Sequence, residues 1–428
     1  MISSRSLLIT LLCLAQLPQV LASDAAPFHA TVADAIQQAH GELWADRVDS
    51  HGIIRDFVGD LPTPEDCSLG KPNAIGWWSP IEDGPMFTGI YLPAACERAR
   101  RSGDEADRAK ARRLAQGLIK CASVSDVPGF IARGIGTDGR CHYPLGSDDQ
   151  THPWFLGLHA YCMSDIPTAA ERREIIAKMR EVADVLETTG WRCPADGAFK
   201  GGFRGSYRGH LFRDAVRYLH LLKVMHEVTQ DSVWQARYEK ARAERPTGSE
   251  ETRVQICAEG YARDHEAIPH IDDHQQWIYV GSQAALAALV AMEKDDAIRA
   301  QFRSGLDANA KASLKALEVH REFDNKDTKV FGHADWRSVF TTWFPQPTQA
   351  EAERLSRISD KTRRGERKSY EQRLMQNPLA AAALAALAGE SGNREAIEST
   401  FLHYDYSKVH MSTFFFAECA WYALPLVK

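Results

Sequence analysis

Two kinds of helical pattern alternate along the chain, and this alternation limits the available folds more than any other feature of the sequence. One kind is apolar on nearly every side, as in residues 277–292, 379–387 and 414–426. The other has one apolar stripe and many charges, as in residues 171–187 and 295–321. A helix that is apolar all round must be buried on all sides, whereas a striped helix covers the outside. The sequence therefore predicts an inner ring of helices wrapped by an outer ring.

Turn and capping residues locate several of these helices. Residues 85–101 carry a helical apolar stripe and run into a Ser-Gly-Asp turn, which predicts the first arm of a helical hairpin. Thr168 and Glu171 form a capping box, and Gly190 is a stop signal, so together they frame another helix. Period-2 alternation is confined to short stretches such as residues 127–135. We therefore predict an all-α fold.

The N-terminus has the three-part pattern of a secretory signal. Arg5 precedes an apolar run over residues 7–17, and the pattern ends at Ala22. We predict cleavage of residues 1–22, a single catalytic domain over residues 23–428, and a periplasmic or secreted location without a membrane anchor. The chain has 51 basic and 57 acidic residues, which does not favour nucleic-acid binding. The oligomeric state is left open.

The cysteines bear on this predicted location. Eight remain once Cys13 is removed with the signal, and none forms a CxxC pair of the kind that holds a metal. Disulfides form in exported proteins, and the better candidates are the three cysteines in predicted loops, Cys67, Cys141 and Cys193. The sequence selects no pairing among them. Four others fall within apolar helical patterns and are expected to be core thiols: Cys96, Cys121, Cys162 and Cys419.

Four long loops separate the predicted helices, at residues 52–80, 127–147, 193–209 and 260–273. They are rich in glycine, proline, aromatic and charged residues. Loops longer than about 12–15 residues tend to be functional or disordered, and the aromatic content here argues for function.

The first candidate cluster lies where a loop runs into a helix. Trp77 and Trp78 precede Glu82 and Asp83, which stand directly before the helix predicted at residues 85–101. An apolar wall raises the pKa of a carboxyl toward the range of a general acid, and tryptophan rings suit the apolar faces of sugars. The alternative reading is that Asp83 only caps its helix.

A second acidic helix start follows. Asp148, Asp149 and Gln150 lead into an apolar helix that carries His152 and Trp154. Two such starts in one chain fit a pair of carboxylates across a sugar-binding cleft, with Asp149 as the second acid/base group. Simple helix capping is again the alternative.

A third cluster occupies the glycine-rich segment 200–210. Its glycines let backbone approach a ligand, and Arg204 and Arg208 offer forked donors to a carboxylate such as that of a uronic acid. Tyr207 and His210 are candidate proton acceptors. A solvated basic loop is the alternative.

A fourth polar-aromatic cluster spans residues 270–277. Although His270 and His274 have the i, i+4 spacing of zinc ligands, the preceding proline and loop character weaken a metal site. We expect substrate binding here, without any metal or cofactor. The expected substrate-binding residues are His270, Asp273, His274, Gln275 and Trp277, and Trp336 in a similar segment. GxSxG, Walker, GxGxxG and HExxH motifs are absent from the sequence.

Residues 82–91, with the turn at 102–104, resemble a hairpin of the six-hairpin glycosidase superfamily. Within this superfamily, the segment is most similar to the unsaturated glucuronyl and rhamnogalacturonyl hydrolases, in which an inward aspartate precedes a glycine and an aromatic helix. The resemblance implies an (α/α)6 toroid with long loops at one end and an aspartate acid/base, and Asp83 and Asp149 match the two aspartates. The Arg-Gly-x-x-Trp-Ala segment of those enzymes has only a loose counterpart in residues 203–207.

Together these patterns predict a glycoside hydrolase that acts on a uronic-acid-containing oligosaccharide. One alternative is a polysaccharide lyase on the same fold, with Tyr207 or His210 as base and Arg208 or Gln275 steadying the enolate. The other is a non-catalytic carbohydrate-binding protein. The expected partner in each case is an oligosaccharide or polysaccharide.

Overall fold

The computed structural model describes residues 27–69, 79–196, 202–267, 275–342, 344, 348–362, 365–389 and 393–426. The predicted signal at residues 1–22 lies outside this set. Within it, every helix is too short or too polar to cross a membrane.

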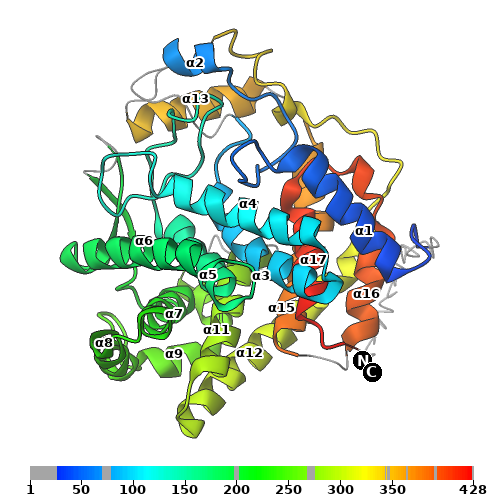
Figure 1. Ribbon diagram of the computed structural model, residues 1–428. Coiled ribbons are helices and arrows are strands. Elements are labelled where there is room, and N and C mark those ends of the chain that lie inside the picture. Colours follow the sequence, from blue (N-terminus) through cyan, green and yellow to red (C-terminus); the bar gives the residue numbers. More distant parts are fainter. Residues whose placement is uncertain are drawn as a thin grey trace, which may run out of the picture.

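Helices make up most of the described chain (Figure 1). The longer ones are α1 (Val32–Glu42), α3 (Gly84–Ser102), α4 (Glu105–Cys121), α5 (Asp148–Met163), α6 (Ala169–Thr188), α7 (Phe212–Thr229), α8 (Ser232–Ala243), α9 (Arg253–Glu259), α11 (Val280–Met292), α12 (Asp296–Leu317), α13 (Gln349–Thr362), α15 (Asn377–Leu387), α16 (Arg394–His403) and α17 (Phe416–Ala423). Shorter helices and single turns are α2 (Pro64–Leu69), α10 (Ala262–Ala267), α14 (Arg367–Glu371), η1 (Leu43–Arg47), η3 (Gln276–Tyr279), η4 (Glu318–Glu322), η5 (Gly332–Ala334), η6 (Gln372–Gln376), η8 (Tyr406–Lys408) and η9 (Ser412–Phe415).

The only sheet in the described ranges pairs two short antiparallel strands, β1 (Arg192–Pro194) and β2 (Phe203–Ser206). The prediction of an all-α protein is therefore confirmed. Three predicted loops contain more regular structure than the sequence indicated. Residues 52–80 include α2, residues 193–209 include β2 and all of β1 except its first residue, and residues 260–273 include α10.

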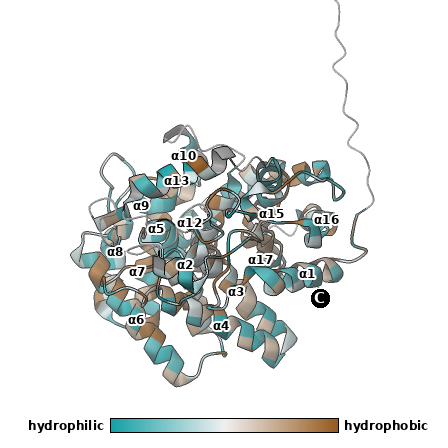
Figure 2. Ribbon diagram, turned by 90° about the horizontal axis from the view of Figure 1, so that it is seen from above, coloured by the Kyte–Doolittle hydropathy of each residue, from teal (hydrophilic) through white to brown (hydrophobic). Residues whose placement is uncertain are grey.

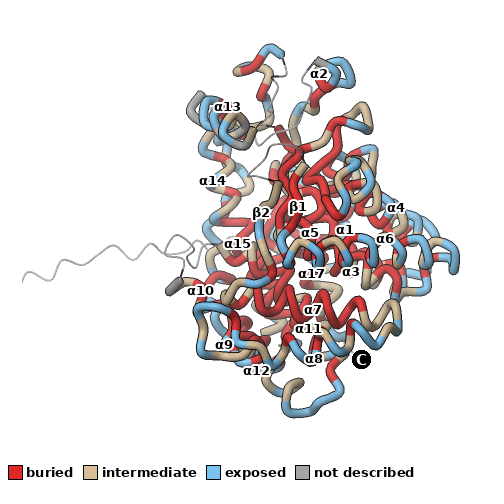
Figure 3. The backbone as a smooth tube through the Cα atoms, turned by 90° about the vertical axis from the view of Figure 1, so that its left-hand side faces the viewer, coloured by how far each residue is buried: buried red, intermediate tan, exposed pale blue. Residues whose placement is uncertain are grey.

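Six helices pack in a closed order around the middle of the molecule. Along the chain, α3 packs on α5, α5 on α7, α7 on α11, α11 on α15 and α15 on α17, and α17 packs back on α3. Figure 3 shows most of this central part as buried. The charged helices α4, α6, α8, α12 and α16 pack against this set from outside, as does α1. The apolar helices expected from the sequence, α11, α15 and α17, belong to this closed order, and the striped helices α6 and α12 pack against it.

The two sets differ in how much of their surface is buried. Every residue of α15 from Asn377 to Ala386 is buried, as expected for a helix that is apolar all round. In α6, burial is confined to one stripe that includes Ile175, Met179 and Leu186. Figure 2 shows hydrophilic and hydrophobic stretches alternating along α6. The capping box of Thr168 at the start of α6 is present as predicted.

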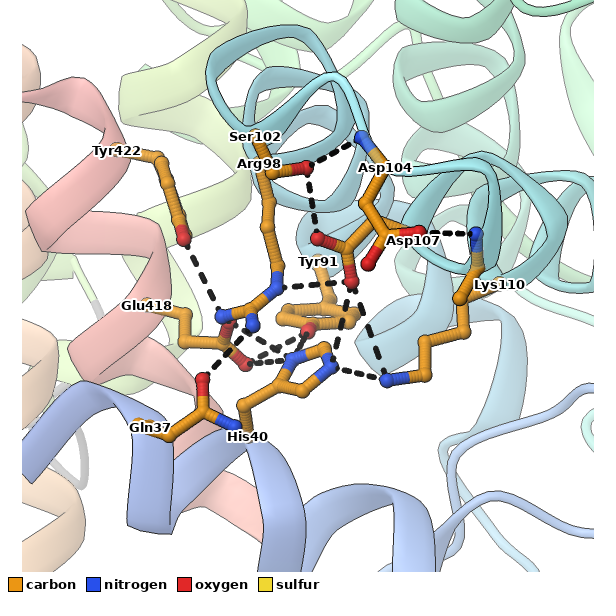
Figure 4. A network of polar contacts seen from close by, with 11 residues as sticks. Gln37, His40, Tyr91, Arg98, Ser102, Asp104, Asp107, Lys110, Glu418 and Tyr422 are labelled. Carbon is orange, nitrogen blue, oxygen red and sulfur yellow. Dashed lines mark hydrogen bonds and ion pairs between the residues drawn. The ribbon is translucent and has the colours of Figure 1, made fainter. Parts of the chain in front are cut away.

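A buried polar network joins the first helix of the described chain to the last (Figure 4). The Glu418 carboxylate in α17 accepts hydrogen bonds from the Tyr91 hydroxyl at 2.6 Å and from His40 Nδ1 in α1 at 3.1 Å. Arg98 lies 3.5 Å from Glu418 and donates to Asp107 of α4 at 3.1 Å. These contacts hold α1 and α17 against the α3–α4 hairpin.

A second, smaller hydrophobic core lies apart from the main one. Cys67 of α2, Leu355 of α13 and Trp336 pack in it, together with Ile81 and Tyr143. In Figures 1 and 3, α2 and α13 lie at one side of the molecule, away from α8 and α12. This core therefore supports the long loops at that side.

Candidate active site

The first acidic residues are positioned by the start of α3. Asp83 occupies the N-cap position, and Pro85 follows in the first turn, where a missing N–H costs nothing. A Cβ on Gly84 would lie only 2.7 Å from the Arg133 carbonyl oxygen. Glycine at this position therefore lets the loop that carries Arg133 pack closely against the helix start.

Three carboxyl groups meet here, those of Asp56, Glu82 and Asp83, which we call the acid triad. Asp56 Oδ2 accepts the backbone N–H of Glu82 at 2.7 Å and that of Asp83 at 3.1 Å. One oxygen from each carboxyl lies within 4.8 Å of the other two. Arg133 supplies positive charge, with Nη1 3.0 Å from Asp83 Oδ1 and 3.8 Å from Glu82.

The acid triad favours protonated carboxyl groups. Burial, followed by repulsion from its two neighbours, raises the pKa of Glu82 to about 8. Burial and the charge of Asp83 raise the pKa of Asp56 to about 7, and burial also raises the pKa of Asp83. Like charges this close do not all ionise together. The triad therefore retains a proton at neutral pH.

The second acidic pair stands in the first turn of α5. Arg217 of α7 is buried, and its Nη1 donates to Asp148 Oδ2 at 2.6 Å and to Asp149 Oδ1 at 2.8 Å. Burial acts to raise the pKa of Asp149, but Arg217, Arg213 and Arg133 outweigh it and hold the value at about 2. Burial and the charge of Asp149 raise the pKa of Asp148. Asp149 is thus ionised at neutral pH, where the triad still holds a proton.

Gln150 connects the triad to this pair. Its Nε2 donates to Asp83 Oδ1 at 2.7 Å, while its Oε1 accepts the backbone N–H of Met86 at 3.1 Å. The charge of Asp149 contributes to the raised pKa of Asp83, and Arg133 acts on both groups. Gln150 thus contacts Asp83, and Asp149 lies near enough for its charge to act on Asp83.

Arg204 of β2 faces this cluster with unused hydrogen-bonding capacity. Its Nη1 is buried and has no hydrogen-bond partner among the described residues. Burial, followed by the charge of Arg133, lowers its pKa, while Asp149 acts in the opposite direction. A buried donor without a partner is costly, and a bound carboxylate would supply the missing acceptor.

Three predicted substrate-binding residues are buried in the protein instead. The Trp154 indole donates to the Leu118 carbonyl at 2.7 Å inside the main core, and Trp336 donates to the Asp60 carbonyl at 2.8 Å inside the second core. The His152 ring lies 3.2 Å from His220, where burial lowers its pKa well below the usual value. Because all three side chains are fully buried, they offer no surface to a sugar, and the prediction that they bind substrate is wrong.

The predicted lyase residues do not share one set of surroundings, and of them Tyr207 lies near enough to Asp148 for that charge to add to burial in raising its pKa. Tyr207 is fully buried, and burial raises its pKa well above the usual value. Arg208 pairs with Glu244 and lies over the Tyr218 ring, so it does not act with Arg204. The His210 ring lies beside Gly248, where an added Cβ would be 3.3 Å from Nδ1. Burial of the Tyr207 hydroxyl, which raises its pKa well above the usual value, disfavours a tyrosine base.

The fourth predicted cluster is described only in part. Trp277 is half-buried and meets Phe87 of α3 edge-on, with ring centroids 6.4 Å apart. Phe87 lies one turn along α3 from Asp83, so Trp277 stays a candidate sugar platform on that side of the acids. Gln275 precedes η3. Outside the described residues lie Trp77, Trp78, His270, Asp273 and His274.

Sequence reasoning missed the residues that tune the acids, namely Asp56, Arg133, Arg213 and Arg217. Arg213 and Arg217 stand four residues apart at the start of α7, which places them on one helix face. That spacing was a usable signal. Asp56 and Arg133 lie in loops, and nothing local in the sequence shows that the fold brings them to Asp83.

Oxygen ligands spaced like those of the acid triad are also what Ca²⁺ or Mg²⁺ takes in proteins. Here Arg133 already supplies positive charge to the triad. The arrangement can therefore act as a proton store without a metal. Comparisons with protein-family models, with curated proteins and with solved structures gave no match for this chain.

Proposed function

We propose that the closed order of helices is an (α/α)6 toroid and that the protein is an exported glycoside hydrolase acting on a uronic-acid-containing oligosaccharide. The observation that carries the proposal is the split in acidity between the proton-holding triad and the ionised Asp149. Carboxyl groups whose surroundings push their pKa values apart are the usual acid and base of such enzymes.

The two groups have separate roles in this proposal. Glu82, whose side chain is 33% exposed, can reach a ligand and donates the proton, with Asp83 and Asp56 maintaining its raised pKa. An acid with a pKa of about 8 is protonated at neutral pH and still gives up its proton readily. Asp149, held ionised by Arg217, accepts a proton from water as that water attacks the sugar.

The substrate class follows from Arg204. The buried Arg204 Nη1 has no hydrogen-bond partner among the described residues, and such a guanidinium fits the carboxylate of a uronic acid better than it fits a neutral sugar. Trp277 offers an aromatic face at the start of η3. Arg208, bound to Glu244, provides a matched arginine in the same segment with its charge already paired.

The test is a screen of the purified protein against uronate polysaccharides and lyase-cut oligosaccharides, read by ultraviolet absorbance and by reducing ends. A hydrolase of unsaturated uronides lowers the absorbance, whereas a lyase raises it. We expect Asp149→Asn and Glu82→Gln each to lower kcat by at least about 100-fold. Arg204→Met should raise KM, while the matched Arg208→Met should leave KM unchanged.

Full turnover by both Asp149→Asn and Glu82→Gln would refute the assignment of acid and base. Tight sugar binding without any turnover would show a binding protein instead. Thermal midpoints measured in parallel separate loss of activity from loss of fold.

A further inference from the structure

Two cysteine thiols from distant parts of the chain meet beside the second hydrophobic core. Cys67 lies in α2, and Cys141 lies in the loop before α5, 74 residues later. Cys141 Sγ donates to the Cys67 carbonyl oxygen at 3.1 Å. The two sulfurs and a carboxylate oxygen of Asp138 all lie within 4.8 Å of one another.

The surroundings of the sulfurs favour a covalent bond over a metal ion. A Cβ on Gly136 would lie 2.8 Å from Cys67 Sγ and 3.3 Å from Cys141 Cβ, so backbone already fills the space on that side. Asp138 Oδ1 accepts the backbone N–H groups of Arg140 at 2.9 Å and Cys141 at 2.8 Å. Among the described residues no fourth ligand completes the tetrahedral set that zinc requires.

We propose that Cys67 and Cys141 form a disulfide that locks α2 to the loop before α5. Each thiol loses one proton and one electron as the S–S bond forms, and the electrons pass to a disulfide oxidant such as oxidised glutathione, which breaks into two thiols. The bond length is about 2.0 Å, so the two sulfurs, which lie within 4.8 Å of each other, approach further as the bond forms. Export, as proposed above, would provide the oxidising environment, but the chemistry does not depend on it.

The two linked segments both carry parts of the candidate active site. The stretch before α2 contributes Asp56, and the loop that contains Cys141 contributes Arg133. Their contacts with Asp83 and Glu82 set the acidity of the triad. The disulfide would therefore hold in place the residues that tune the proposed acid.

Burial determines when the bond forms. Both sulfur-bearing residues are buried, with Cys67 fully inaccessible. An oxidant cannot reach them in the folded protein, so the bond forms during folding, and once formed it resists reduction. The full chain should therefore be refolded in parallel in a glutathione redox buffer and in excess reductant.

The oxidised sample should lose two titratable thiols and two hydrogens in intact mass, and peptide mapping should link Cys67 to Cys141. Its thermal midpoint should be about 5 °C above that of the reduced sample. Cys67→Ser and Cys141→Ser should each abolish this difference. Cys257→Ser, which removes a buried thiol in α9, should preserve it.

Retention of both thiols after oxidative refolding, or a link to another cysteine, would overturn the proposal. So would zinc binding that Cys67→Ser abolishes, because the cluster would then be a metal site. Thiol counts and mapping need no substrate, so a negative result here is distinguishable from failure of the proposed function.

Discussion

Arg217 is the residue whose removal most directly tests the electrostatics of the site. Only 2% of its side chain is exposed, and it donates to both Asp148 and Asp149. In Arg217→Met these carboxylates lose their closest positive charge. Removing one partner of a buried ion pair costs about 3–5 kcal/mol of unfolding free energy. Arg213, 4.0 Å from Asp149 and 24% exposed, is the matched control, and Arg213→Met should cost less than about 1 kcal/mol.

The cost should depend on pH in a defined direction. In the wild type the pKa of Asp149 is depressed to about 2, so its stabilising contribution is present above 3.8 and is lost as pH falls through 2. In Arg217→Met, burial and mutual repulsion raise the pKa of the pair above the unfolded value of 3.8, so the folded variant holds a proton that the unfolded chain has released. The deficit of the variant should therefore grow as pH rises from about 4 to about 7.

Denaturant unfolding at several pH values measures this deficit, and thermal melts support it. A chain of 428 residues has an unfolding entropy near 0.9 kcal/mol per kelvin, so the deficit corresponds to about 3–6 °C at neutral pH. A deficit that is the same at all pH values would show lost packing instead of lost charge pairing. Equal deficits for Arg217→Met and Arg213→Met would refute the specific role of Arg217.

Further predictions concern the raised acids and the network that joins the chain ends. Asp56→Asn removes a charge that raises the pKa of Glu82, so the alkaline limb of the pH–rate profile should move to lower pH; an unmoved limb would contradict the coupling. Asp214 lies in the first turn of α7, and burial raises its pKa to about 7. The wild type should therefore lose stability relative to Asp214→Asn as pH rises from 3.8 toward 7. This loss should be about 4 kcal/mol at most. If denaturant unfolding gave the same stability difference between wild type and Asp214→Asn at every pH, the predicted titration of Asp214 would be wrong. Glu418→Ala leaves the buried groups drawn in Figure 4 without their acceptor and should cost about 3–5 kcal/mol. The control Glu97→Ala, at a side chain that is 26% exposed, should cost only about 1 kcal/mol. Equal losses in urea unfolding would argue against the network.

The sequence predicted the helices well because their signals are local. The apolar stripe over residues 85–101 corresponds to α3, and Thr168 caps α6 as expected. The neighbours of each acid were harder to predict from the sequence, because Asp56 and Arg133 come close to Asp83 only when the chain folds. The sequence therefore predicted the acidic residues at the helix starts, but it did not predict the residues that set their pKa values.

The aromatic predictions failed for a related reason. Trp154 and Trp336 stand beside polar residues in the sequence, which suggested a binding surface. Each indole instead finds a backbone carbonyl inside a core, which satisfies its N–H and buries the ring. Composition near a loop does not reveal which side of the helix faces inward. Tyr207 shows the same effect, since its glycine-rich segment folds into β2 and a turn that buries it.

The central claim is that a protonated triad and an ionised Asp149 act together on a uronate sugar. The pH dependence of kcat/KM on an unsaturated uronate oligosaccharide tests it most directly, because this ratio reports the acid and base of the free enzyme. We predict that kcat/KM stays constant through neutral pH and declines above about pH 8, where Glu82 loses its proton. A rate that keeps rising above this pH would show that a group must lose its proton for catalysis, and would contradict the account.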